Sequence, residues 1–253
     1  MTVSYSIPNT PAGTGYSAPY FNYVASGAAQ NVQLTTSGNS LCVDSSTTWI
    51  LSQTPESSGG YATPLLAGSS TTEQWITTTI AGTSAAGTFV FPYYHQYLQT
   101  MSYSVVNGGT PTNPIFSATN QFGSTAPQTV TTTAVTYWYD AGTSWSITAT
   151  TAGIAGEQWI TAGGTSGTIT GARTFAWKLD HQYYLTMVAS GPGTVKPASG
   201  WKNAGQSYAI SATHNAGHVF TSWAGTGTGS FTGTSKSATV TMNSPITETA
   251  TFT

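Results

Sequence analysis

The sequence predicts an all-β protein built as three tandem immunoglobulin-like antiparallel β-sandwich modules, the last one smaller than the others. Three observations lead to this prediction. Segments rich in Thr, Val, Tyr and Phe alternate with period two between clusters of Gly, Asn, Pro and Ser, as strands and turns do. Sustained helical periodicity is missing, and the helix formers Lys, Glu, Arg and Leu are scarce. One pattern of residues also recurs three times, which is typical of a repeated structural unit.

The recurring pattern divides the chain into modules at residues 1–95, 96–181 and 182–253. Modules of about ninety residues with short strands every 8–12 residues have the size and rhythm of an immunoglobulin-type sandwich. The last module is near the size at which a single core becomes marginal, so we expect packing against its neighbour to stabilise it. The clearest strand signals are at 128–139, 207–213, 237–242 and 247–252.

Each module contains two strands joined by a turn of related sequence. The three copies read LCVDSSTTWIL, YWYDAGTSWSITAT and GWKNAGQSYAISAT. Asp44, Asp140 and Asn203 stand at the turn, where an Asx side chain can bond the backbone two residues on. A calcium ligand is the alternative interpretation. The Asn in the third copy argues against it, because calcium sites are rich in carboxylates.

Large aromatic residues occupy equivalent positions in the three modules, which predicts that they fill the cores. EQWIT at 73–77 and 157–161 and TSWAG at 221–225 place three Trp residues in one column. Cys42 shares another column with two more Trp residues, and we expect its thiol to be buried. A buried Trp removes about 200 Å² from water, or roughly 5 kcal/mol of gross transfer free energy. The residues expected in the repeated cores are Trp49, Trp138, Trp145, Trp201, Tyr208 and Trp223.

Two histidines occur in similar strands, PYYHQYLQTM and DHQYYLTM, that join one module to the next. His95 and His181 each stand among Tyr, Gln and Thr without a second His or a Cys nearby, so a zinc site is not expected. We expect each ring to be partly buried, to bond a neighbouring loop and to fix the hinge. His214 and His218 are four residues apart, but a turn separates them and no Glu lies between them, so metal binding is not expected there either.

Paired carboxylates are the remaining candidates for catalysis. Glu73 and Glu157 of the EQWIT segments, with Asp44 and Asp140, could supply two carboxylates per module for glycoside hydrolysis. The third copy has Thr221 in the Glu column, and repetition of a fold is commoner than repetition of one active site. We therefore predict no enzyme activity, and no catalytic, cofactor-binding or metal-binding residue.

The alternative function is a carbohydrate-binding module array, either on its own or accessory to a secreted hydrolase. It predicts that Trp75 and Trp159 lie exposed as stacking platforms for sugar rings, with Glu73 and Glu157 beside them. The structural interpretation instead buries both indole rings. Their solvent exposure therefore separates the two functions.

Composition restricts the partners. Charged residues make up only 5% of the chain, and no Lys or Arg precedes Arg173, so nucleic acid is not an expected partner. No apolar run is long enough for a membrane helix.

The opening VSYS matches MSYS at 101–104, which predicts an excised piece of a longer protein without its signal peptide and anchor. Few carboxylates also predict tolerance to acid.

The residues of the third module carry a resemblance to a known family. Gly200-Trp201, Ala204-Gly205, the pair Phe220 and Trp223, and the closing strand 246–252 resemble divergent internalin-type B-repeat domains, which occur in tandem on microbial surface proteins. The first two modules, with YWYDAGTSWSI, EQWI and HQY, resemble β-sandwich repeats of secreted archaeal proteins, including those of thermoacidophiles. The resemblance implies an extracellular or cell-surface spacer, adhesin, filament or surface-layer component. Its partners would be other copies, neighbouring modules of the parent protein and surface glycans.

Overall fold

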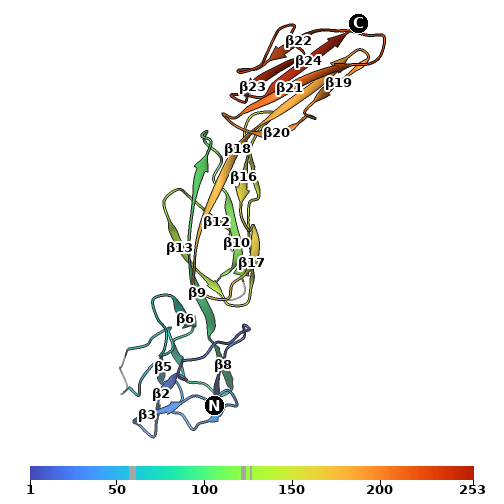
Figure 1. The fold of residues 1–253 in the computed structure, drawn as a ribbon. Helices are drawn as coiled ribbons and strands as arrows, with labels where there is room; N and C mark the ends of the chain where they lie inside the picture. The colour runs from blue at the N-terminus through green and yellow to red at the C-terminus, as the bar shows by residue number, and fades with distance from the viewer. Residues whose placement is uncertain (57–60, 121–123, 126) are drawn as a thin grey trace.

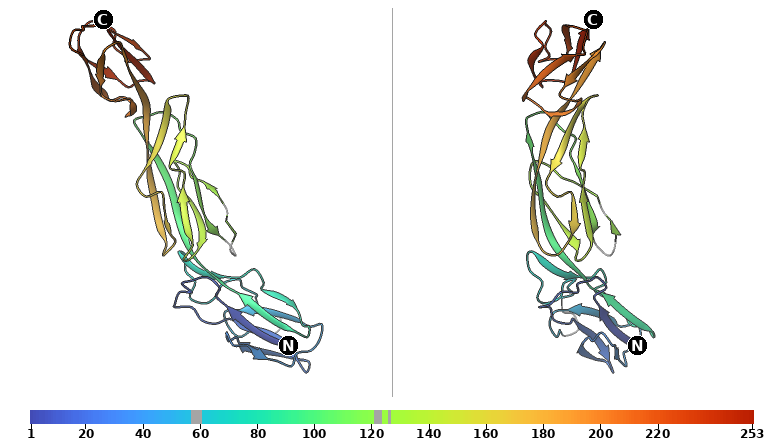
Figure 2. Two further views of the ribbon diagram at one scale, coloured as in Figure 1. Left: turned by 90° about the vertical axis from the view of Figure 1, so that its right-hand side faces the viewer. Right: turned by 45° about the vertical axis from the view of Figure 1, so that its right-hand side comes forward.

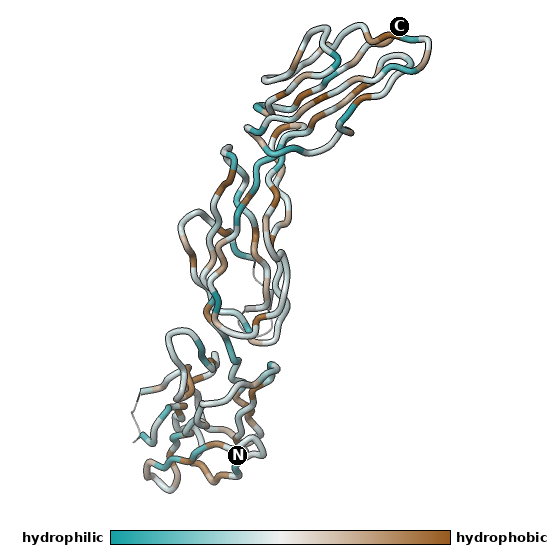
Figure 3. The backbone as a smooth tube through the Cα atoms, in the orientation of Figure 1, coloured by the Kyte–Doolittle hydropathy of each residue, from teal (hydrophilic) through white to brown (hydrophobic). Residues whose placement is uncertain are grey.

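The computed structural model describes residues 1–56, 61–120, 124–125 and 127–253, and every regular element in this part of the chain is a β-strand. The predicted all-β fold is therefore confirmed. Figures 1 and 2 show three groups of strands arranged end to end in an elongated molecule, with the two termini in the outer groups. Hydrophobic residues recur along the strands of all three groups (Figure 3). The described residues contain no helix long and apolar enough to cross a membrane.

The first module is a sandwich of two small sheets. Its strands are β1 (Thr2–Ser6), β2 (Tyr20–Ala25), β3 (Ala28–Gln33), β4 (Asn39–Ser40), β5 (Thr48–Ser52), β6 (Glu73–Ile76), β7 (Ala81–Thr83) and β8 (Thr88–Pro92). One sheet has the order β4-β1-β8 and the other the order β3-β2-β5-β7. Phe21, Trp49 and Phe91 come from both sheets, and their ring centroids lie 5.1 to 6.0 Å apart. This aromatic cluster joins the two layers.

The second module is larger and contains the longest strand. Its strands are β9 (Tyr94–Val106), β10 (Ile115–Asn120), β11 (Ser124–Thr125), β12 (Gln128–Thr129), β13 (Val135–Asp140), β14 (Ser144–Ile147), β15 (Thr150–Ala152), β16 (Glu157–Ala162), β17 (Ser166–Thr168) and β18 (Arg173–Ser190). One layer has the order β13-β9-β18-β16-β15, and the other is built on β10, β14 and β17. Trp145 packs edge-on against Phe175, with centroids 4.7 Å apart, and so joins the layers.

The third module is the smallest sandwich. Its own strands are β19 (Gly193–Lys196), β20 (Gly200–Asn203), β21 (Ser207–His214), β22 (Phe220–Thr226), β23 (Ser237–Thr241) and β24 (Ile246–Phe252). β19, β21 and β23 form one layer, and β20, β24 and β22 join the end of β18 in the other. Alternate residues of β24, including Glu248, are buried, as expected for a strand with one face on a core. Trp223 and Phe252 are in that core.

Two strands pass from one module into the next. β9 pairs with β6 of the first module at His95 and lines the second core at Met101. β18 lines the second core at Leu179 and the third core at Leu185. The predicted boundaries at 95/96 and 181/182 therefore fall inside continuous strands.

The sheets are not purely antiparallel. In each module the strand that enters and the strand that leaves are parallel neighbours: β1 with β8, β9 with β18, and β18 with β24. The other strand pairs that the structure describes are antiparallel. The parallel pair follows from the arrangement of the chain, which enters each module at one end and leaves it at the other.

The core prediction needs two corrections among its tryptophans. Trp49, Trp145 and Trp223 are buried in the first, second and third cores, and Tyr208 packs partly buried against the third. The prediction is wrong for Trp201, which is 39% exposed.

Trp138 is half-buried and lies outside the second core, so the prediction is wrong there too. Successive residues of a strand point to opposite faces. Tyr139 points into the core, so its neighbour Trp138 points away from it. Cys42, in the same column as these two tryptophans, is exposed rather than buried.

Candidate functional site

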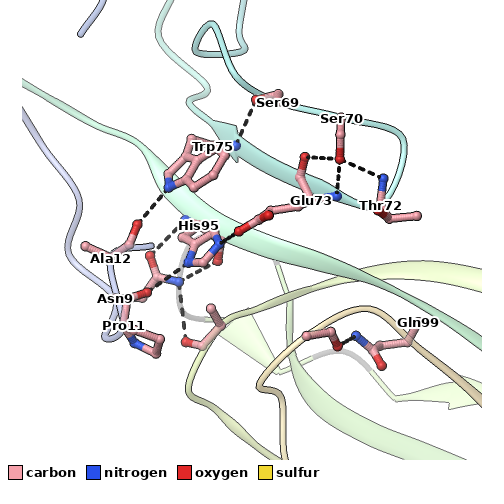
Figure 4. A network of polar contacts seen from close by, with 12 residues as sticks. Asn9, Pro11, Ala12, Ser69, Ser70, Thr72, Glu73, Trp75, His95 and Gln99 are labelled. Atoms are coloured by element: carbon pink, nitrogen blue, oxygen red, sulfur yellow. Dashed lines mark hydrogen bonds and ion pairs between the residues drawn. The ribbon is translucent and has the colours of Figure 1, made fainter. Parts of the chain in front are cut away.

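The joint between the first and second modules holds a buried cluster of polar and aromatic side chains (Figure 4). Trp75 on β6 and His95 on β9 are partners in the antiparallel pairing of these strands. The imidazole ring lies flat on the indole ring, with centroids 4.7 Å apart and planes 4° apart. Both side chains are buried, so the stack is inaccessible to solvent.

Both ring nitrogens of His95 face hydrogen-bond acceptors. Nδ1 lies 2.8 Å from the carbonyl oxygen of Pro11, and Nε2 lies 2.7 Å from Oε1 of Glu73 (Figure 4). A carbonyl oxygen can only accept, so Nδ1 carries a hydrogen and donates it. The contact between Nε2 and Oε1 then contains one further proton, which joins His95 to Glu73.

The loop before β2 closes over this stack. Asn9 binds the backbone of His95 on both sides: Oδ1 accepts from the amide nitrogen at 2.9 Å, and Nδ2 donates to the carbonyl oxygen at 2.5 Å. Trp75 Nε1 donates to the carbonyl oxygen of Ala12 at 2.7 Å. Gly13 has a φ of +77°, and a Cβ atom there would lie 2.6 Å from Cε1 of His95. Both the conformation and the close approach require glycine.

The joint between the second and third modules repeats this arrangement. His181 stacks on Trp159, with centroids 4.4 Å apart and planes 7° apart. Its Nε2 lies 2.8 Å from Oε1 of Glu157, and its Nδ1 lies 3.2 Å from the carbonyl oxygen of Asn107. Trp159 Nε1 donates to the carbonyl oxygen of Gly108 at 3.2 Å. The same four kinds of contact therefore recur at the end of the first module and at the end of the second.

A tyrosine completes each cluster. Tyr97 packs against the ring of His95 with centroids 4.7 Å apart, and Tyr183 packs against His181 at 4.6 Å. Burial, and then the charge of and hydrogen bond to Glu73, raise the pKa of Tyr97 above its usual value. Burial and Glu157 raise the pKa of Tyr183 in the same way. Each carboxylate thus pairs with an imidazole and lies near a phenol.

A row of amide side chains crosses each joint next to the aromatic cluster. At the first joint, Gln74 Nε2 donates to Gln96 at 2.9 Å, and Gln96 Nε2 donates to Asp140 of the second module at 2.7 Å. At the second joint, Gln158 donates to Gln182 and Gln182 donates to Asn203 of the third module, both at 3.0 Å. These rows connect three strands across each boundary.

Backbone hydrogen bonds accompany the amide rows. The carbonyl oxygen of His95 accepts from the amide of Ala141 at 2.8 Å, and that of His181 accepts from Ala204 at 2.9 Å. The turn at the start of the second and third modules is therefore attached to the histidine strand of the module before it.

The structure places the predicted stacking residues in the interior. Trp75 is 1% and Trp159 3% exposed, so neither ring offers a face to a sugar, and this prediction is wrong. Glu73 and Glu157 bind histidine instead of flanking an open platform. The strand register explains why, because it sets each Trp opposite a buried His.

The predicted bonds from the histidines to neighbouring loops are present, whereas the two Glu–His pairs and the amide rows were not predicted from the sequence. A signal for the pairs exists within the chain. Glu73 and Glu157 occur in the two modules that also have the His, whereas the third has Thr221 in the Glu column. Trp223 of that module is buried with its Nε1 unpartnered among the described residues.

Turns are present at the three predicted positions, but the predicted bond from the Asx side chain to the backbone two residues on is replaced at Asp44 by bonds outside the turn. Asp44 accepts from the amides of Ser26 and Gly27 at 2.9 and 2.7 Å. Asp140 and Asn203 accept from the amide rows. Within the described ranges, no three His, Cys, Asp or Glu side chains come together as metal ligands do.

Comparison with known proteins gives one family match. The model of the divergent InlB B-repeat domain matches residues 183–253, in agreement with the resemblance of the third module. Among solved structures, the TIE protein of Bacillus anthracis is similar over 99% of this chain at 11% identity and a TM-score of 0.32. This chain spans 49% of the length of that one. A mutant of the major pilin of Streptococcus pyogenes is similar over 99% of this chain and 96% of the pilin, at 8% identity and a TM-score of 0.17. No curated protein matches the chain.

Proposed function

We propose that this chain is a non-enzymatic, rod-like segment of an extracellular or cell-surface protein, where it serves as a spacer, adhesin, filament or surface-layer component. The observation that carries the proposal is that β9 and β18 each build two modules while buried contacts hold the joint around them. The match of residues 183–253 to a B-repeat domain supports it, because that resemblance implies a surface setting.

The joints are suited to keep neighbouring modules in a fixed orientation. A flexible linker would leave the modules free to reorient, because few contacts would cross the boundary. Here the covalent connection is a strand with hydrogen-bonded neighbours on both sides. The amide rows add side-chain hydrogen bonds from that strand to the strands on both sides of it, so bending would break several hydrogen bonds together.

We take the three modules as tandem repeats with boundaries near 95/96 and 181/182. The equal register of Trp75 with His95 and of Trp159 with His181 supports this. In such an array, total stability is approximately a sum of module terms and neighbour-interface terms. The joints described above are those interface terms.

The non-enzymatic part of the proposal rests on how the candidate carboxylates are used. Glu73 and Glu157 are paired with His95 and His181, and buried Asp140 accepts a hydrogen bond from Gln96. A general acid or nucleophile has to reach a substrate. These groups instead hold strands together.

The stiffness of the first joint can be measured by double electron–electron resonance. Exposed Cys42 takes one nitroxide label in the first module, and Thr168→Cys provides a second exposed site in the second module. We expect one narrow distance distribution. Asn9→Ala, which removes the clamp on His95, should broaden it, whereas Asn31→Ala on exposed β3 should not. A parent distribution as broad as that of Asn9→Ala would refute a stiff rod.

Surface location is tested on cells of the source organism. Antibodies raised against this chain should label intact cells or their shed material. Labelling that requires cell lysis would contradict the proposal, whatever the stiffness of the rod.

A further inference from the structure

An aromatic pair with one exposed ring lies on the outer face of the second joint. Trp201 on β20 is 39% exposed, whereas the other tryptophans are buried or half-buried. Its partner in the strand pairing is Tyr184 on β18. The two rings meet edge to face, with centroids 5.3 Å apart and planes 81° apart. This contact fixes the indole ring while leaving much of it in solvent.

The amide row of this joint lies on the same face as the aromatic pair. Gln182 precedes Tyr184 by two residues, and Asn203 follows Trp201 by two, so alternation puts all four side chains on one side of the sheet. Gln182 and Asn203 are also strand partners. Gln158 extends the row onto β16.

The first joint has an equivalent Trp and an equivalent row of polar side chains, but these are less exposed to solvent. Trp138 is the partner of Leu98 and is half-buried, and Gln74, Gln96 and Asp140 are buried. At the second joint, by contrast, Asn203 is exposed and the two glutamines are only partly covered. Holding two modules together does not require this opening, because the first joint does so without it.

The open row has hydrogen-bonding capacity left over. Within the described residues, Asn203 Nδ2 makes no hydrogen bond to the protein, and neither does Gln158 Oε1. A primary amide offers two donors and a carbonyl acceptor. The row therefore presents a free donor at one end and a free acceptor at the other, beside an exposed indole.

Alternation along the strands puts Lys202 and Glu157 on the opposite side of the sheet from the amide row, where Lys202 lies 5.4 Å from the ring centroid of Tyr208 and Glu157 is paired with His181. The charged residues of β18 that share the side of Gln182 are Lys178 and Asp180, one of each sign. These opposite charges leave this side of the sheet without a strong field of either sign. It fits a neutral ligand that combines an apolar face with hydroxyl groups.

We propose that Trp201, supported by Tyr184, and the amides of Gln182 and Asn203 bind a neutral carbohydrate. The C–H face of a pyranose ring would stack on the indole, and its hydroxyl groups would exchange hydrogen bonds with the amide row. This places glycan recognition at an outward-facing column of the module repeat, rather than at Trp75 and Trp159, which are buried.

Affinity electrophoresis of the whole chain in native gels tests the proposal. The gels contain hydroxyethylcellulose, yeast mannan or galactomannan, with polygalacturonate as the charged comparison. We expect at least one neutral polymer to retard the parent chain. Trp201→Ala should weaken this retardation by at least about tenfold, and Asn203→Ala by less.

Two control variants distinguish binding at this site from nonspecific binding of the polymers. Trp138→Ala removes the equivalent ring of the closed joint, and Tyr61→Ala removes an isolated Tyr that is 92% exposed; neither should change retardation. Should Trp138→Ala fail to fold by circular dichroism, Tyr61→Ala still provides the comparison. Equal retardation of Trp201→Ala and the parent would overturn the proposal. Retardation by no neutral polymer, or by polygalacturonate alone, would overturn it as well. None of these outcomes affects the rod, which is tested by the spin-label distances.

Discussion

The imidazole of His181 lies flat on the indole of Trp159, with ring centroids 4.4 Å apart and planes 7° apart. The stack is on the strand that leaves the second module and enters the third. Nδ1 and Nε2 of the imidazole both face acceptors. These contacts prevent the ring from rotating within its plane, and the stack on the indole holds its face. The first two predictions below concern what this stack contributes to stability.

Removing this imidazole should destabilise the protein strongly. His181→Ala opens a cavity beside Trp159 and leaves Glu157 without its main partner, and we expect a loss of about 3 kcal/mol. His214→Ala, at an exposed strand end, should change the free energy of unfolding by less than about 0.5 kcal/mol. Urea unfolding followed by Trp fluorescence measures both. Similar values for the two variants would show that the His–Glu pair contributes little.

Two adjacent glycines should respond differently to alanine. Gly108 and Gly109 have φ values of +78° and +79°, so alanine is strained by about 1 kcal/mol at either position. A Cβ at 109 would also lie 2.6 Å from Trp159 Cζ2, whereas one at 108 meets nothing within 4 Å. We expect Gly109→Ala to cost at least about 2 kcal/mol more than Gly108→Ala. Equal losses in thermal melts would mean that the loop moves away from the stack at little cost.

The buried amide row should matter more than the open one. Gln96→Leu removes a donor to buried Asp140 and should cost about 2–3 kcal/mol. Gln182→Leu removes the equivalent donor to exposed Asn203, which water can replace, and should cost less than about 1 kcal/mol. Chemical denaturation of the two variants gives the comparison. A larger loss of unfolding free energy for Gln182→Leu than for Gln96→Leu would contradict the expectation that the buried hydrogen bond contributes more.

Glu248 should make the third module more stable in acid than at neutral pH. Its side chain is 0% exposed; Oε1 accepts from the amide of Phe231 at 2.6 Å, and Oε2 is buried without a partner among the residues that the structure describes. Burial raises the pKa of Glu248, against a smaller opposite effect of the Phe231 hydrogen bond. With the folded pKa above the unfolded one, the contribution is complete below the unfolded pKa and is lost as pH rises through the folded pKa.

Glu248→Gln tests this contribution. At pH 7 the variant should be more stable than the parent by about 1 kcal/mol, because it removes a buried charge. At about pH 3, where Glu248 is protonated in both states, the difference should disappear. Melting curves of parent and variant at the two pH values measure it. A variant that is less stable than the parent at pH 7 would contradict the expected direction.

Periodicity and repetition were sufficient to predict the all-β fold, because both are local properties of the chain. The face on which each tryptophan lies was harder to predict. In the segment YWYD, Tyr139 and Trp138 are both apolar enough for a core, and alternation alone does not say which points inward. The register between β13 and β9 decides it, and register depends on residues far apart in sequence.

The polar contacts at the joints could not be predicted from the sequence for the same reason. Glu73 and His95 meet because β6 and β9 pair with Trp75 opposite His95, across 22 residues of chain. Acid tolerance stays a prediction. Burial raises the pKa of Glu248, so this residue is expected to favour the folded state in acid.

The parallel pairing of β9 with β18 has a mechanical consequence. A pull on the two ends of the second module acts along these neighbouring strands in opposite directions, so the ladder from Gln99 with Arg173 to Val106 with Asp180 is loaded in shear. Its hydrogen bonds then share the force, whereas a hairpin pulled at its open end loses them one after another. The first and third modules contain the same kind of parallel pair. Tension along the rod therefore loads the hydrogen bonds of this pair in shear in every module.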